Sequence, residues 1–307
     1  MTDRSLLLAY TGDSSDIRAL YAGEVTEVPA WWRDVWVTPF GQWGDQDGED
    51  GYTGFDYNVL GITVGIDRPV SDRLVLGASA AYTDTDVDQD KGHGDGDIEG
   101  WMASLYGSYS LDNAYVDGAL SYGRNDYDAK RRVQVGTINR TARSDHDGDV
   151  LAATLGGGYL IARDDSVLEP FGRLRYVRLD EDAFTESGAS SVNQQITSRD
   201  TDSLTSEIGM RVSRLYQKAT GWLTTDASIA WLHDFDIDDR TITTSYTGAP
   251  ASSFSIPGQD VERNGVTLGL GVGFETRKGV STSLNYNGEF RDGFSAHGII
   301  GRVGYRF

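Results

Sequence analysis

Hydrophobic and polar residues alternate with a period of two along many stretches of the chain from Trp31 onward. The clearest stretch is 263–276, where one face is large and apolar and the other is small or polar. The apolar positions are Val266, Leu268, Leu270, Val272 and Phe274. Successive side chains of a strand point to opposite faces, so this pattern predicts strands with one apolar surface. Each stretch has roughly the ten residues that a tilted strand needs to cross a bilayer.

Twelve such stretches follow one another. They lie at 31–43, 57–68, 72–84, 98–110, 113–127, 147–163, 167–179, 202–216, 219–234, 263–276, 279–290 and 295–307. The links between them alternate in length. Short links with turn residues lie at 67–71, 111–113, 164–166, 217–219 and 277–279, and longer polar ones at 44–56, 85–97, 128–146, 180–201 and 235–262, with a brief last one at 291–294. Outer-membrane barrels have short periplasmic turns and longer outer loops. We therefore predict an all-β fold, a 12-stranded antiparallel transmembrane β-barrel.

Average hydropathy points the other way at first sight, because only 38% of residues are hydrophobic and the mean hydropathy is −0.41. A barrel strand needs apolar residues on one face only, so its average stays low while its outer wall is continuous. The abundance of Gly (38) and Tyr (16) beside 6 Pro suits many strands joined by turns. All seven Trp residues fall in or beside the predicted strands, as interfacial aromatic residues should.

Charge and cysteine content exclude several classes of function. The net charge is −20, from 27 basic and 47 acidic residues, which argues against nucleic acid as a partner. Acidic residues gather at 84–97, 145–149 and 234–239. The chain has no cysteine, which excludes disulfides and thiolate metal sites. We expect no cofactor.

Residues 1–30 lack the alternation. Ser14–Val25 reads better as a short helix, with Ser14 or Ser15 as its cap and Asp16 in its first turn. We expect two parts, a linker segment at 1–30 and a barrel at 31–307. No basic and apolar leader precedes this segment, and we expect an export signal and further sequence upstream of Met1 in the natural protein.

The C-terminal strand ends on an aromatic residue. Ile299, Val303, Tyr305 and Phe307 share one face. This ending resembles the signature of outer-membrane proteins that the barrel assembly machinery recognises. The resemblance implies that these four residues form an assembly signal.

The whole arrangement resembles the β-domain of monomeric autotransporters. It rests on the strand pattern, the length, the preceding helix and the Trp-rich opening at 31–37. In that family the barrel sits in the bacterial outer membrane, an N-terminal passenger is secreted, and a linker helix stays in the lumen. The resemblance implies a monomer whose partners are the lipid bilayer, lipopolysaccharide, the assembly machinery and its own passenger. Some members cleave the passenger at an Asn pair in the lumen, and segment 1–30 contains no Asn.

Opposite charges occupy inward positions on neighbouring strands. They are Glu169, Arg173, Arg175, Glu207, Arg211, Asp226, Glu275, Glu289, Arg302 and Arg306. A network of lumen ion pairs explains them more simply than a selective pore or a catalytic acid pair does.

Two further patterns point to chemistry, and each has a simpler interpretation. Asp86, Asp88 and Asp90 have the spacing of a calcium loop, but Lys91 stands where the loop needs Gly, so a solvated hairpin tip is favoured. None of the four His residues lies in a recognisable nucleophilic constellation. We therefore predict a translocator without catalytic activity, with a small diffusion pore as second hypothesis and an outer-membrane hydrolase as third.

Overall fold

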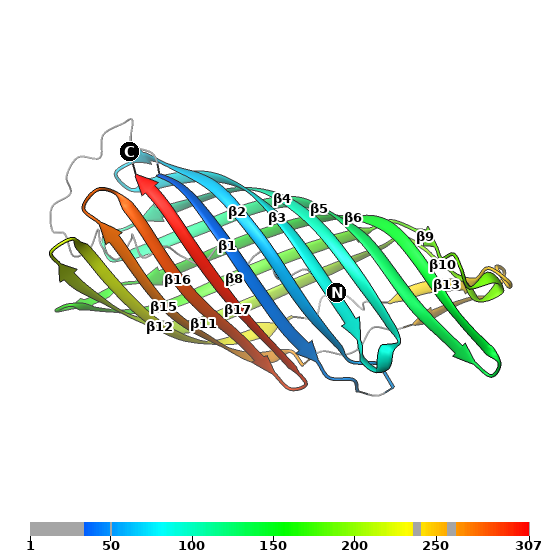
Figure 1. The fold of residues 1–307 in the computed structure, drawn as a ribbon. Helices are drawn as coiled ribbons and strands as arrows, with labels where there is room; N and C mark the ends of the chain where they lie inside the picture. The colour runs from blue at the N-terminus through cyan, green and yellow to red at the C-terminus, as the bar shows by residue number, and fades with distance from the viewer. Residues whose placement is uncertain (1–33, 50, 236–240, 257–261, 307) are drawn as a thin grey trace.

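The computed structural model describes residues 34–49, 51–235, 241–256 and 262–306. Its strands form a closed antiparallel barrel with strongly tilted strands (Figure 1). Closure comes from two pairings beyond the run of neighbouring hairpins: β8 pairs with β11, and the last strand pairs with the first from Val35 opposite Tyr305 to Gln46 opposite Phe294. The predicted 12-stranded barrel is confirmed.

The wall strands differ in length. In chain order they are β1 (Asp34–Gln46), β2 (Phe55–Ser71), β3 (Leu74–Gln89), β4 (Gly94–Ser110), β5 (Ala114–Val135), β6 (Ile138–Tyr159), β8 (Ser166–Glu181), β11 (Arg199–Lys218), β12 (Gly221–Asp234), β15 (Asn264–Thr276), β16 (Val280–Arg291) and β17 (Phe294–Arg306). The short β7 (Ile161–Arg163) continues β6 and pairs with β8. Tight turns join these strands at one end, and the other end carries the longer connections together with two-residue turns at 136–137 and 292–293.

The outer connections contain more strand than the sequence pattern predicted. Residues 128–146, predicted as a loop, lie mostly in the β5–β6 hairpin, which is paired up to Val135 opposite Ile138 and turns at Gly136 with φ of 59°. Here polar and charged residues occupy both faces. Beyond the bilayer no lipid requires an apolar face, so the alternation of apolar and polar residues that marks the other strands disappears. The backbone pairing nevertheless continues.

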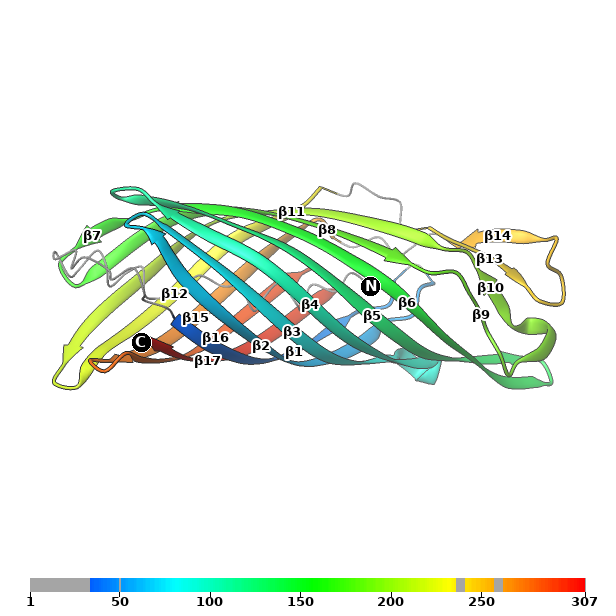
Figure 2. The ribbon, with the colours of Figure 1, turned by 90° about the horizontal axis from the view of Figure 1, so that it is seen from above.

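Two more outer connections, 180–201 and 235–262, also differ from the predicted loops. They contribute β9 (Phe184–Thr185), β10 (Gln194–Ile196), β13 (Ile242–Tyr246) and β14 (Ser253–Ile256) to a small second sheet of order β14-β13-β10-β9. Two 3₁₀ turns, η1 (Asp90–Gly92) and η2 (Ser190–Val192), complete the outer elements. Figure 2 shows this sheet at the end of the barrel opposite the short turns.

An apolar belt surrounds the barrel, and aromatic residues border it on both sides. Along β2 the outward residues Leu60, Ile62, Val64 and Ile66 are all exposed. Exposed aromatic side chains flank the belt toward the outer loops at Trp43, Tyr82, Trp101, Tyr122 and Trp231, and toward the short turns at Tyr109, Tyr159, Tyr216 and Tyr305. Such girdles form where amphipathic rings meet lipid headgroups.

The predicted helix at Ser14–Val25 and the terminal Phe307 lie outside the described residues. Among the residues that are described, no helix is long and apolar enough to cross a membrane.

Candidate functional site

The charged residues predicted to face the lumen lie mostly on β8 and on the strands around it. The strand register places opposite charges next to each other there. Glu169 on β8 lies directly across from Arg211 on β11, and the carboxylate and guanidinium are 3.3 Å apart. Tyr115 donates a hydrogen bond of 2.6 Å to the same carboxylate. Glu169 is 3% exposed, so these partners offset the cost of removing its charge from water.

Two inward positions further along, the same two strands repeat the pairing with the signs exchanged. Arg173 on β8 faces Glu207 on β11, with 3.2 Å between Nη1 and Oε2. Arg175 follows on β8 as a buried inward residue opposite Thr205. Asp226 on β12 forms no ion pair within the described residues, and its carboxylate lies over Gly271, where a Cβ atom would come within 2.3 Å of Oδ1. A side chain at position 271 would therefore displace the Asp226 carboxylate from this position.

The predicted charges near barrel closure divide between the two ends of the lumen. Arg306 pairs with Glu275 at 3.1 Å near the short turns. Glu289 pairs at 2.7 Å with Arg291, near the outer loops. Arg291 was not among the predicted residues, although its side chain is fully buried and also contacts Asp234 at 3.7 Å.

Arg302 takes part in a cluster that holds the first and last strands together inside the lumen. Its guanidinium lies 3.5 Å from the carboxylate of Asp67 and 4.5 Å from the ring centroid of Trp36. The Trp36 indole donates to Asp67 at 3.2 Å and to the Tyr106 hydroxyl at 3.1 Å, and that hydroxyl donates to Asp67. The cluster therefore joins β17, β1, β2 and β4.

Two glycines leave room for the aromatic rings of this cluster to lie against the wall. A Cβ atom at Gly65 would meet the Trp36 ring at 2.3 Å, and one at Gly77 would meet the Tyr106 ring at 2.3 Å. Sequence reasoning placed Asp67 in a turn and missed the cluster. The signal was present, because Asp67 continues the inward series of β2 when the alternation is extended beyond Ile66.

The lumen wall also carries apolar patches, which the predicted split into an apolar outside and a polar inside did not include. One consists of Phe40, Val59 and Ile300. The other consists of Met102, Val150, Ala152, Val177 and Leu179. All eight are at most 6% exposed. The inward side of the wall therefore combines ion pairs with closely packed apolar side chains.

A second polar cluster lies at the outer mouth, beyond the apolar belt. Glu181 at the end of β8 accepts two hydrogen bonds of 2.6 Å from Arg199 and lies 3.4 Å from Nε2 of His146. The His146 ring is stacked between Tyr127 and Phe184, at 4.8 and 4.1 Å between centroids. Burial opposes the charge on Glu181, but the hydrogen bonds from His146 and Arg199 outweigh it and lower the pKa of Glu181 to about 2.

Nearby, the tip of the β5–β6 hairpin is fixed to the small second sheet. Arg131 on β5 forms a bidentate ion pair with the buried Glu186, with 2.8 Å between Nε and Oε1. Arg140 on β6 donates to the carbonyl oxygen of Ala189 at 2.9 Å. These contacts hold the outer elements as an ordered structure over the barrel end.

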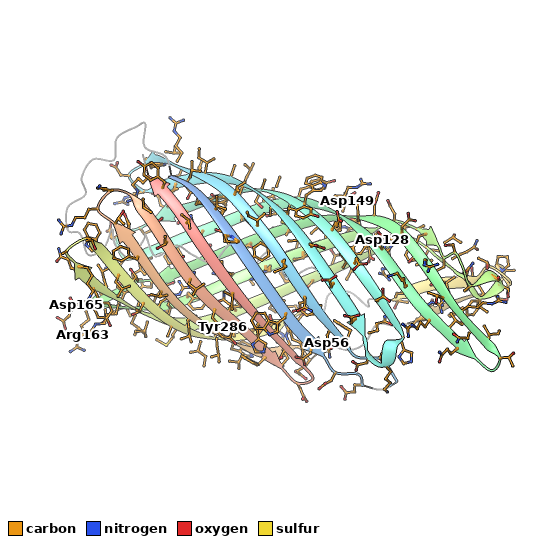
Figure 3. The ribbon with its side chains drawn as sticks, viewed as in Figure 1. Asp56, Asp128, Asp149, Arg163, Asp165 and Tyr286 are labelled. Carbon is orange, nitrogen blue, oxygen red and sulfur yellow. The ribbon has the colours of Figure 1, made fainter. Side chains whose placement is uncertain are left out.

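The acidic residues considered for calcium do not converge. Asp86 and Asp88 are exposed on β3 and face Asp97 and Asp95 of β4 in register, while Asp90 lies in η1. No group of three or more side chains suited to a metal ion occurs among the described residues. Figure 3 shows Asp128 and Asp149 toward the end that carries the outer sheet, and Arg163 and Asp165 at the opposite end.

The histidines take part in local contacts. His233 lies 3.1 Å from the Asn264 side chain and His297 lies 2.8 Å from the Tyr286 hydroxyl. His93 contacts the carbonyl oxygen of Asp90 at 2.7 Å. In the predicted assembly signal, Ile299, Val303 and Tyr305 are exposed on the outer face of β17. Their proposed recognition stays a prediction.

An apolar belt, two aromatic girdles, short turns at one end and a charged lumen define an outer-membrane β-barrel. The sequence profile of the autotransporter β-domain matches residues 35–287. The chain belongs to this family, and it is an outer-membrane translocator domain for a passenger.

Individual relatives agree with this assignment. The chain is 22% identical over 273 residues to an extracellular serine protease of Serratia marcescens, covering 89% of this chain and 26% of that protein. It is 29% identical to outer membrane protein B of Rickettsia prowazekii, covering 69% of this chain and 13% of that protein. The chain thus spans about a quarter or less of these relatives.

The fold is similar to that of the translocator domain of the autotransporter NalP from Neisseria meningitidis. The TM-score is 0.72 at 20% sequence identity, over 95% of this chain and 94% of that one.

Proposed function

We propose that residues 1–30 are the linker that stays in the lumen after the passenger has crossed, and that residues 31–307 form the barrel around it. The observation that carries this proposal is the composition of the lumen wall. Ion pairs such as Glu169 with Arg211 alternate with the apolar patches around Val59 and Val150. A segment such as Ser14–Val25, which combines charged and apolar residues, matches this mixed composition.

The barrel itself has no catalytic role in this proposal. The protease named among the relatives is matched over 26% of its length, so its activity need not belong to the matched part. The further partners are lipopolysaccharide around the outer girdle and the barrel assembly machinery, which recognises the C-terminal face with Phe307, Tyr305, Val303 and Ile299.

Conductance in planar bilayers tests the position of residues 1–30. The full chain should conduct weakly, and deletion of residues 1–28 should raise the conductance sharply because the lumen is emptied. A large conductance that the deletion leaves unchanged would contradict the linker proposal and favour a diffusion pore.

Surface display tests translocation separately. An epitope fused ahead of Met1 should become accessible to added protease on intact cells. Variants that carry the epitope on a barrel with Tyr305→Asp should accumulate it in the periplasm, since the altered face would no longer be recognised during assembly. Normal display by this variant would contradict the proposed assembly signal.

A further inference from the structure

Two cations lie against one aromatic ring at the short-turn end of β11. Arg214, Tyr216 and Lys218 alternate along this strand and so share its outward face. The Arg214 guanidinium carbon lies 5.2 Å from the Tyr216 ring centroid, and the Lys218 Nζ lies 5.7 Å from it. Tyr216 is 36% exposed, so its ring remains accessible from outside the barrel.

No carboxylate neutralises these two cations within the described part of the chain. Arg214 faces Ser166 on β8 and Thr225 on β12, and Lys218 faces Gly221. Neither cation forms an ion pair there, with Asp164 and Asp165 included, which lie in the adjacent turn just before Ser166 and outside the strand pairing. The backbone N–H of Leu215 donates a hydrogen bond to the carbonyl oxygen of Asp165, which holds this turn beside β11. In a chain of net charge −20, such a pair of unneutralised cations leaves a place for an external anion.

The depth of this group in the membrane identifies the anion. Ile208, Met210 and Val212 precede Arg214 on the same outward face and belong to the apolar belt. Tyr216 belongs to the girdle next to the short turns, which are periplasmic in this family. The cations therefore lie at the headgroup level of the periplasmic leaflet, where anionic phospholipids attract Lys and Arg.

We propose that Arg214, Tyr216 and Lys218 form a binding site for the headgroup phosphate of an anionic phospholipid in the periplasmic leaflet. A phosphate between the two cations offsets their mutual repulsion. The Tyr216 ring holds both cations on the lipid side, and Arg163, opposite Ser166 on β7, adds a third positive charge at the edge of the site. The acyl chains of this lipid lie along the belt beside Val212.

Native mass spectrometry of the full chain in a neutral detergent tests the proposal. The barrel is titrated with phosphatidylglycerol and, separately, with phosphatidylcholine. We expect the anionic lipid to bind more tightly, and the double variant R214Q/K218Q to bind it about thirtyfold more weakly. The matched control R277Q/K278Q removes the same charge from the turn of the next periplasmic hairpin, where one cation, Arg277, and not two, lies against an aromatic ring, that of Trp222 at 5.8 Å, and it should leave the affinity unchanged.

The outcomes separate the alternatives. Equal loss in both double variants would show general charge attraction, and no loss in R214Q/K218Q would place the lipid elsewhere, so either result overturns the site. Displacement of phosphatidylglycerol by millimolar inorganic phosphate would make this a free-anion site and overturn the lipid assignment. Heat-modifiable migration on gels shows for each variant that the barrel is folded, and surface display of the passenger reports on translocation independently.

Discussion

At the scale of single residues, the lumen is organised by side chains that lie flat along the wall and by glycines that make room for them. The Trp36 ring lies over Gly65, and the Tyr106 ring lies over Gly77. Neither glycine has a backbone conformation that requires it, because both belong to extended strands. Their role is steric, and it fixes the rings where they can share hydrogen bonds with Asp67.

A methyl group at Gly65 tests this arrangement. The Gly65→Ala variant should displace the Trp36 ring, because the new atom would lie 2.3 Å from it, and should destabilise the barrel by roughly 1–3 kcal/mol. Gly118→Ala is the matched control, since its Cβ atom would meet its nearest neighbour at 3.5 Å. The temperature at which the folded gel band disappears measures the difference. Equal temperatures for both variants would show that the Trp36 ring moves aside without cost.

The pair of Glu169 and Arg211 tests whether the lumen charges stabilise the wall or only neutralise one another. Removing one partner, as in Glu169→Leu, leaves Arg211 without its 3.3 Å contact in a confined lumen and should cost roughly 3–5 kcal/mol. The double variant E169L/R211M should cost less than either single change. A double-variant cycle based on urea unfolding in micelles measures this. Additive losses would contradict the proposed coupling.

At the scale of elements, the sequence predicts the strands within the bilayer and fails beyond it. The apolar stripe of 263–276 corresponds to β15 almost residue for residue, because lipid on one side enforces the alternation. The outer halves of β5 and β6 are paired equally well, but both of their faces meet water or polar side chains. Nothing in their sequence distinguishes such a hairpin from a loop, and the contacts of Arg131 and Arg140 that order it come from connections distant in sequence.

The same limit applies to the candidate site. Alternation places Glu169, Arg211 and Glu275 on the inner face, because their strands have a clear period. The alternation does not predict which of these charged residues form ion pairs with each other. Arg302 was expected to pair with a lumen acid, and its partner is Asp67. Asp67 lies two strands away, on the far side of β1, and the sequence pattern assigned it to a turn. Partner choice depends on the shear of the closed barrel, and the sequence carries no local signal for it.

The cluster at the outer mouth should respond to acid in a defined range. The pKa of Glu181 is lowered to about 2, against about 4.3 for an unfolded glutamate. Its stabilising effect is therefore complete above about pH 4.5 and is lost as the pH falls toward 2. Hydrogen exchange of the segment around Phe184 should rise over this range, and Glu181→Gln should show high exchange at every pH. Wild-type exchange that rises already between pH 7 and 5 would contradict Glu181 as the cause.

At the scale of the whole molecule, charge is distributed unevenly between the two ends. Beyond the outer girdle, two rows of four acidic residues cross β3, β4, β5 and β6 on the outside of the wall. The rows are Asp84, Glu99, Asp126 and Asp147, and Asp86, Asp97, Asp128 and Asp145, each residue directly opposite the next. At the periplasmic end the exposed outward residues next to the belt include Arg68, Arg163, Arg214 and Lys218.

The acidic rows should make the stability of the barrel depend on salt. Like charges directly opposite each other in a sheet repel, and the screening length falls from roughly 10 Å at 0.1 M to about 3 Å at 1 M salt, so that molar salt screens even directly opposite pairs. Added sodium chloride should therefore raise the unfolding temperature. The variant D97N/D128N breaks the second row in three places and should unfold a few degrees higher at low salt, with the gain disappearing at high salt. The control D164N/D165N removes two charges at the opposite end, where no such row exists. If both variants shift equally and keep the salt dependence of the wild type, the rows are not its source, and net charge alone explains it.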